Sequence, residues 1–323
     1  MPGPAARAEN YLAPETLVQL APFELRAKMI VEGVMSGMHR SPYQGMAVEF
    51  AQHRQYVAGD DLKHLDWKVY GRSDKLYVKQ YQQETNLDVI VMVDASASMR
   101  FGTLDVKRDW GGTDASRQHG VWTKFDHSTA IAVAAAYLCL AQQDRVGLVI
   151  FADEIRHMVA RSSAGEQWRR IVTALSTHPV DARTNLAKVT DQVLGKVTNR
   201  ALFVIISDFF DDLDAIRSAL ARFRHRRHDV VLLQPLDRQE MRFDYAHPAP
   251  FEGLEGEGRR RIDPRALREA YLDAMVAHVD GIATTARGFG FDYERLDTHE
   301  SVGPALSHLL ARRNAFIKRS KRS

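Results

Sequence analysis

The sequence predicts an α/β fold, with a mainly parallel, Rossmann-like sheet that carries helices on both faces. Three short apolar runs support this prediction: LDVIVMV at 87–93, RVGLVIF at 145–151 and ALFVII at 201–206. They lack polar alternation, which is typical of strands buried on both faces. Segments with helical periodicity separate the three runs, and such alternation of strand and helix favours parallel pairing in a doubly wound sheet.

The other elements are expected from local periodicity and turn residues. N-terminal to the first apolar run we expect a helix at 14–37, a short helix from Leu62 and a half-exposed strand at 76–81. After that run we expect helices at 126–143, 165–177, 186–197 and 213–226, and strands at 155–160 and 230–236. The chain then continues with a surface hairpin or flap within 241–261, a helix at 264–287, a strand at 289–296 and a helix at 302–316. These elements suggest an N-terminal extension that packs on the main domain (1–86), the main domain (87–240) and a C-terminal hairpin, strand and helix addition (241–323).

Composition excludes several classes of protein. The 323 residues include 44 basic and 41 acidic side chains, a net charge of +3, which gives no broad field for binding nucleic acid. The single cysteine, Cys139, excludes an internal disulfide, and no His/Cys cluster suggests zinc. The first residues lack the apolar core of a signal peptide, and the longest apolar run, 130–141, is shorter than the ~20 residues that span a bilayer. We therefore expect a cytoplasmic protein without a membrane span.

The first apolar run ends at an acid, and small polar residues follow it. Asp94 is followed by Ala95, Ser96, Ala97 and Ser98. In open α/β sheets, ligands bind outside the carboxyl ends of the strands. One carboxylate and two hydroxyls at alternate positions are hard oxygen ligands, which suit Mg²⁺ or Mn²⁺ rather than zinc. The alternative is that these side chains only cap the next helix.

Two other loops reach the same edge of the predicted sheet. Asp208 follows the run at 201–206, and Thr184 lies on the loop before the preceding helix. Two carboxylates and three hydroxyls would serve a six-coordinate divalent cation with one open position. The expected metal ligands are Asp94, Ser96, Ser98, Thr184 and Asp208. Residues 101–123 separate the Asp94 loop from its helix by more than the usual few residues, which suggests a tolerated insertion, with a lid or a partner-reading element as the alternative.

These motifs carry a resemblance to known families. DxSxS after a buried strand, then Thr, then a strand that ends in Asp resembles the von Willebrand factor A fold over about 87–236, with its metal-ion-dependent adhesion site (MIDAS). The pattern EFxxxRxYxxGDDxxxxDW at 49–67, followed by DASASM, resembles the bacterial domain-of-unknown-function family 58. Members of that family are commonly encoded beside MoxR-type AAA+ ATPases.

The resemblance implies a metal-dependent protein-protein interaction module, in which the open metal position accepts a carboxylate from a partner. It implies that Asp94, Ser96 and Ser98 form the first motif of the metal site, Thr184 the second and Asp208 the third. It also implies a MoxR-type AAA+ ATPase, or its client, as the partner in chaperone-like assembly or regulation.

The alternative is an enzyme. Haloacid-dehalogenase-type phosphatases also place an Asp after the first parallel strand and acids later, as in SDFFDD at 207–212, and they form an aspartyl-phosphate with Mg²⁺. Asp94 would then be the nucleophile, but the general acid expected two residues later is Ser96, which cannot act as one. No GxxxxGK[ST], GxSxG or HExxH motif is present, so we expect no catalytic activity.

Overall fold

The computed structural model describes residues 53–56, 67–73, 75–79, 87–105, 113, 120–256 and 258–320. The chain divides into two compact units: residues 38–86 form one, and residues 1–37 with 87–323 form the other. Each is described by itself. The helix expected at 14–37, the residue Leu62 and most of the 101–123 segment lie outside the described residues. The domain boundaries at 86 and 240 stay predictions.

Among its described residues, the smaller unit contains one short antiparallel pair of strands. In it β1 (His53–Gln55) pairs with β2 (Tyr77–Lys79), which falls within the strand expected at 76–81. Between them along the chain lies α4 (Trp67–Ser73). The Trp67 and Tyr70 rings meet edge to face at 6.2 Å, and both side chains are exposed.

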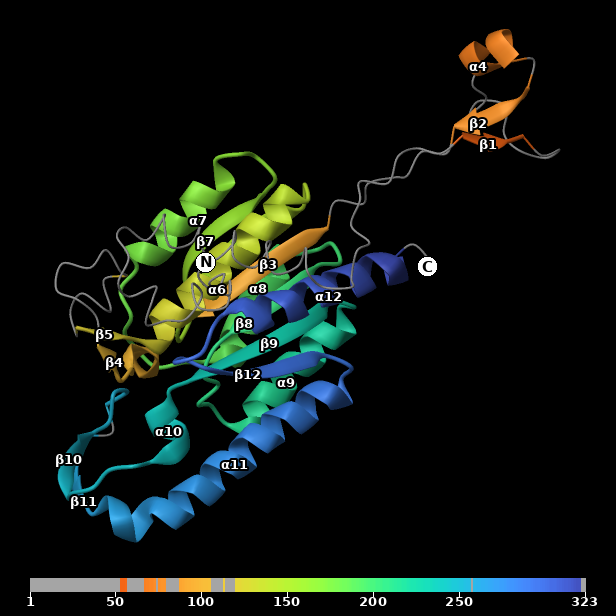
Figure 1. Ribbon diagram of the computed structural model, residues 1–323. Coiled ribbons are helices and arrows are strands. Elements are labelled where there is room, and N and C mark those ends of the chain that lie inside the picture. Colours follow the sequence, from red (N-terminus) through yellow and green to blue (C-terminus); the bar gives the residue numbers. More distant parts are fainter. Residues whose placement is uncertain are drawn as a thin grey trace, which may run out of the picture. The chain divides into compact units, whose positions relative to one another are not determined.

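The larger unit is built on a six-stranded sheet with the order β12-β9-β8-β3-β6-β7. All pairings are parallel except that of β7 with β6. Figure 1 shows β8, β9 and β12 side by side in this sheet. The strands are β3 (Asp88–Asp94), β6 (Arg145–Phe151), β7 (Ile155–Ser162), β8 (Leu202–Ile206), β9 (Asp229–Leu236) and β12 (Asp292–Asp297). Every residue of β3, β8 and β9 is buried. The apolar runs at 87–93 and 201–206 predict this burial for β3 and β8.

Helices cover both faces of this sheet. One layer contains α6 (Lys124–Ala141), α7 (Gln167–Ser176) and α12 (Gly303–Ser320), with α6 in contact with the other two. The opposite layer contains α8 (Leu186–Lys196), α9 (Leu213–His225) and α11 (Pro264–Gly288), with α9 between the others. The predicted α/β class, a mainly parallel sheet with helices on both faces, is confirmed.

The helix α6 is buried on nearly all sides, as predicted, but it begins two residues earlier than expected. The reason is a capping box: the Thr123 side chain accepts from the Asp126 N–H, and the Asp126 side chain accepts from the Thr123 N–H. The helix therefore starts at Lys124, whose side chain is fully buried.

The strand order reverses at β3. From β3 the chain first adds β6 and β7 on one side, then returns to add β8, β9 and β12 on the other. Val93 pairs in register with both Ile150 and Ile206, and Asp94 pairs with Phe151, so the ends of the three strands are nearly level. In open α/β sheets the crevice beyond the carboxyl ends at such a reversal is the usual ligand site.

Smaller elements surround these strand ends. The 3-10 helix η2 (Ala97–Arg100) follows β3, and β4 (Leu104–Asp105) pairs with β5 (Val121–Trp122) across the base of the 101–123 segment. The short helix α10 (Arg238–Arg242) precedes β10 (Ala249–Glu252) and β11 (Arg259–Ile262), which form the hairpin expected within 241–261. None of the helices among the described residues combines the length and apolar character needed to cross a bilayer.

Candidate functional site

The carboxylate of Asp94, the last residue of β3, is the centre of a buried oxygen cluster. Asp94 is fully buried, and its Oδ1 accepts a hydrogen bond from the Ser96 N–H at 2.8 Å. Its Oδ2 accepts from the Ser207 hydroxyl at 2.5 Å and from the Thr184 hydroxyl at 3.3 Å. The Ser96 and Ser98 hydroxyl oxygens lie 3.1 Å apart. Four of the five residues singled out in the sequence therefore meet in one cluster.

Backbone hydrogen bonds hold the contributing loops together. The Ala97 N–H donates to the Ala182 carbonyl at 2.8 Å, and the Asp181 N–H donates to the Ala95 carbonyl at 3.0 Å. Ala182 adopts a left-handed conformation with φ +66°, which is unfavourable for a residue with a Cβ atom. This conformation turns the chain two residues before Thr184, so the strained loop positions one of the cluster's hydroxyls.

The fifth residue, Asp208, lies beside this cluster and is paired with a lysine. Its Oδ2 is 2.8 Å from Lys124 Nζ, and both side chains are fully buried. The same ammonium is 2.6 Å from Oε1 of Glu240, on α10. Asp208 Oδ1 accepts from the Phe210 N–H at 3.3 Å, and the Phe210 ring centroid is 4.7 Å from Lys124 Nζ. One cation thus serves two carboxylates.

Burial and a neighbouring charge make Asp94 difficult to ionise. Burial raises the pKa of its carboxyl most, and the negative charge of Asp208 raises it further. Hydrogen bonds from Ser207 and Ser96 oppose this effect only in part, so the pKa of Asp94 reaches about 7. The ionised carboxylates of Asp94 and Asp208 therefore repel each other, and a bound cation would relieve that repulsion.

Lys124 stays charged despite its burial. Burial alone would lower the pKa of its ammonium, but Asp208 and then Glu240 outweigh that effect and raise the pKa above its ordinary value. Burial raises the pKa of the Glu240 carboxyl, while Lys124 lowers it. A buried ion pair of this kind depends on every partner, because removal of one leaves an uncompensated charge.

A second polar cluster lies at the ends of β9 and β12. The buried Asp237 accepts from the Thr103 N–H at 3.0 Å, from the Thr103 hydroxyl at 2.8 Å and from the Thr298 hydroxyl at 3.2 Å. Nε2 of His299 is 3.1 Å from the Thr103 hydroxyl and 3.4 Å from Asp237. A catalytic triad needs both ring nitrogens of its histidine. Here one nitrogen makes both contacts, so the cluster instead anchors the start of the 101–123 segment.

The oxygen donors around Asp94 fit a hard divalent cation. Carboxylate and hydroxyl oxygens are ligands that Mg²⁺ and Mn²⁺ accept. In the part of the chain that the structure describes, no group of three His, Cys, Asp or Glu side chains could hold a metal ion. A cation here would therefore depend on the hydroxyls of Ser96, Ser98 and Thr184 as much as on its two carboxylates.

The comparisons with known proteins place the chain in a family. The family model described as "protein of unknown function DUF58" matches residues 52–280, which is more than half of the chain and includes every residue of the oxygen cluster. The chain belongs to this family. The family predicted from the motifs at 49–67 and 94–99 is therefore confirmed.

The chain is similar to several other proteins and solved structures. Uncharacterised proteins of Mycobacterium bovis and Mycobacterium tuberculosis are each 28% identical to the chain over 282 residues, covering 86% of it and 83% of the relative. A conserved hypothetical protein BatB from Bacteroides thetaiotaomicron is 15% identical, covering 70% of this chain and 98% of its own, with a TM-score of 0.41. The SpRpn10 VWA domain is 10% identical, covering 69% and 94%, with a TM-score of 0.38.

Three residues of the site escaped the sequence analysis as functional groups: Lys124, Ser207 and Glu240. Ser207 lies next to Asp208 in the turn after β8, and it contacts Asp94 at a shorter distance than Thr184 does. The available signal for Lys124 is its position at the start of α6, because a helix that is buried on nearly all sides leaves a lysine no exposed face.

Proposed function

We propose that this domain binds a divalent cation, Mg²⁺ or Mn²⁺, and uses it to bind an acidic residue of a partner protein. The proposed ligands are Asp94, Ser96, Ser98, Thr184 and Asp208. The observation that supports the proposal is the oxygen cluster itself: hydroxyls from two loops surround a fully buried carboxylate at the strand-order reversal, with a second carboxylate beside it.

The charges of the site favour a cation over an empty cluster. Lys124 pairs with Asp208 and Glu240, so its single positive charge is already shared between two carboxylates. Asp94 adds a second fully buried carboxyl, and among the described residues its hydrogen-bond donors are hydroxyls and a backbone N–H. A divalent cation would compensate Asp94 and favour its ionised form, which burial and Asp208 disfavour.

The bound cation would supply an open coordination position for a carboxylate oxygen of the partner. Asp94, Ser96 and Asp208 are buried, whereas Ser98 and Thr184 are partly exposed. The partner would therefore approach from the side of Ser98 and Thr184.

A thermal unfolding titration with Mg²⁺ and Mn²⁺ tests the metal site. A ligand that binds only the folded state, at 100 times its Kd, adds ~2.7 kcal/mol to the free energy of unfolding. We expect the wild-type protein to show this stabilisation and the Asp94→Ala variant to lose it. The matched control is Asp214→Ala, which removes an exposed carboxylate from α9. Equal responses of wild type and Asp94→Ala, or no response in either, would contradict the proposal.

The partner proposed from the family resemblance is a MoxR-type AAA+ ATPase or its client, in the cytoplasm. Co-purification from the native host, with Mg²⁺ and with EDTA, tests this partner. We expect the ATPase to be recovered with wild type in Mg²⁺ and to be depleted with Asp94→Ala. Recovery of no ATPase under either condition would count against the partner but not against the metal site, and fractionation of the host cells would check the location.

A further inference from the structure

The end of α9 carries a concentrated positive charge that the metal site does not use. Residues 222–228 read RFRHRRH, whereas the whole chain has a net charge of only +3. Arg222 pairs with Asp191 of α8 at 2.8 Å. Arg224, Arg226 and Arg227 are exposed, and within the described part of the chain none of the three makes an ion pair.

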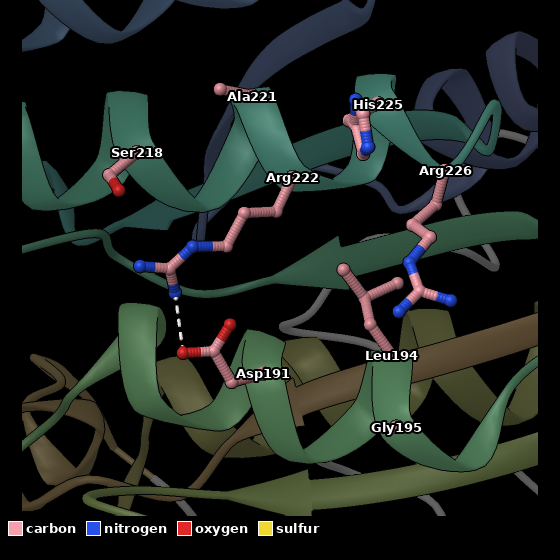
Figure 2. A pocket seen from close by; sticks show the side chains of 8 residues that line it. All are labelled: Asp191, Leu194, Gly195, Ser218, Ala221, Arg222, His225 and Arg226. Carbon is pink, nitrogen blue, oxygen red and sulfur yellow. Dashed lines mark ion pairs between the residues drawn. The ribbon is translucent and has the colours of Figure 1, made fainter.

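A groove between α8 and α9 lies beside these arginines. Its volume is about 560 Å³, within the range of roughly 300–1,000 Å³ that is usual for ligand sites. Figure 2 shows the Arg222 and Arg226 side chains extending from α9 toward α8, with Leu194 between them. Gly195 presents no side chain to the groove, so the surface of α8 stays open there.

Helix stability explains only part of this charge. Cations in the last turn of a helix interact favourably with its dipole, by about 0.3–1 kcal/mol each, which accounts for Arg224 and His225. Arg227 follows the helix cap with φ +59°, a left-handed conformation that is usual for glycine and costs other residues roughly 1–2 kcal/mol. An arginine at this position therefore needs a reason other than the stability of α9.

We propose that the groove between α8 and α9 is a second interaction site, which binds an acidic segment of a partner protein. Arg226 pairs with a carboxylate inside the groove, and Arg227 with one at its end. Guanidinium groups bind carboxylates through two parallel hydrogen bonds, which favours arginine for these contacts. The low net charge of the chain favours a short acidic segment over an extended polyanion such as nucleic acid.

This site is separate from the oxygen cluster. The groove is lined by the C-terminal halves of α8 and α9, from Asp191 on one helix and Ser218 on the other. The oxygen cluster lies before the N-terminal ends of the same helices, at Thr184 and Asp208. The groove therefore needs no metal ion, and its test is carried out in EDTA.

The test is fluorescence anisotropy with a labelled oligo-glutamate peptide. We expect Arg226→Gln to weaken binding about tenfold, the effect of losing one charge-assisted contact. The matched control is Arg217→Gln, which removes the same charge from an exposed position of α9 outside the groove and should change the Kd less than about twofold. Gly195→Leu keeps every charge and fills the groove; a Cβ added there has no atom within 4 Å, so the fold accepts it. We expect it to weaken binding about tenfold as well.

Three results would overturn the proposal. An equal loss of peptide affinity in Arg217→Gln and Arg226→Gln would mean that the peptide is attracted by charge without specificity. Unchanged peptide binding by Gly195→Leu would mean that the groove is not the site. Tighter binding of an oligonucleotide or an anionic lipid vesicle than of oligo-glutamate would mean another class of partner. Asp94→Ala should bind the peptide as wild type does, so failure of the metal site leaves this test intact.

Discussion

Replacement of Asp94 by Asn should stabilise the metal-free protein at neutral and alkaline pH. The pKa of this carboxyl rises from 3.8 to about 7 on folding, mainly through burial and then through the charge of Asp208. Between these two values the folded state binds the proton more strongly than the unfolded state, so the free energy of unfolding falls as the pH rises from about 4 to about 7. At 1.36 kcal/mol for each pKa unit, the loss is about 4 kcal/mol.

Asparagine removes this loss because it does not titrate. Its side-chain oxygen can still accept from the Ser96 N–H, and its amide can donate to the Ser207 hydroxyl. The measurement is urea denaturation of wild type and Asp94→Asn in EDTA from pH 4 to pH 8. We expect the stability difference between the two proteins to shift by about 4 kcal/mol in favour of the variant across this range. Asp214→Asn, on an exposed carboxylate, is the control and should follow wild type.

If the proposed site binds Mg²⁺, a concentration of 100 times its Kd should reduce this advantage of the variant by ~2.7 kcal/mol, because the cation would stabilise the ionised carboxylate of wild type and Asn lacks that charge. A stability difference that stays constant from pH 4 to pH 8 in EDTA would refute the argument that burial and Asp208 hold Asp94 against ionisation. So would a shift with pH in favour of wild type in EDTA.

Three further substitutions test other parts of the structure by urea denaturation. Lys124→Met should cost about 3–5 kcal/mol, because the fully buried Asp208 and the partly buried Glu240 lose their cation; a loss below 1 kcal/mol would contradict these ion pairs. Gly102→Ala places a Cβ 2.0 Å from the Trp122 carbonyl oxygen and should cost at least about 1–3 kcal/mol, whereas the control Gly195→Ala, with no atom within 4 Å, should gain up to about 1 kcal/mol. Ala182→Gly should be neutral or gain about 1 kcal/mol, because glycine adopts φ +66° without strain; a loss above 1 kcal/mol would argue against that conformation.

The fold was predictable where strands are buried on both faces. The apolar runs at 87–93, 145–151 and 201–206 had to become central strands, and they are β3, β6 and β8. The order of the strands was not predictable. The pairing of β12 with β9 depends on how whole layers of helices and strands pack. The sequence of β12, DYERLD, is compatible with several positions at the edge of the sheet.

The candidate site, like the fold, was predictable from the sequence only in part. The order of Asp94, Ser96, Ser98, Thr184 and Asp208 along the chain, and their places at strand ends, predicted residues that the structure brings to one edge. Lys124 was missed because a lysine ordinarily extends into water, and its burial follows from the tertiary contacts of α6. Glu240 was missed because it reaches the site only through β9 and the capping box of α10. The spacing of residues along the sequence indicates neither the burial of Lys124 nor the position of Glu240.

The two outer strands of the sheet have a consequence for how the protein meets other chains. An exposed strand edge offers unpaired N–H and C=O groups to any extended peptide, which promotes aggregation unless charges block it. The outer strand β7 carries Arg156, His157 and Arg161, and β12 carries four charged residues in DYERLD. Addition of a partner strand would force these charges together or out of water. Partners should therefore recognise loops and helices, and concentrated solutions of the folded domain should resist the growth of intermolecular sheets.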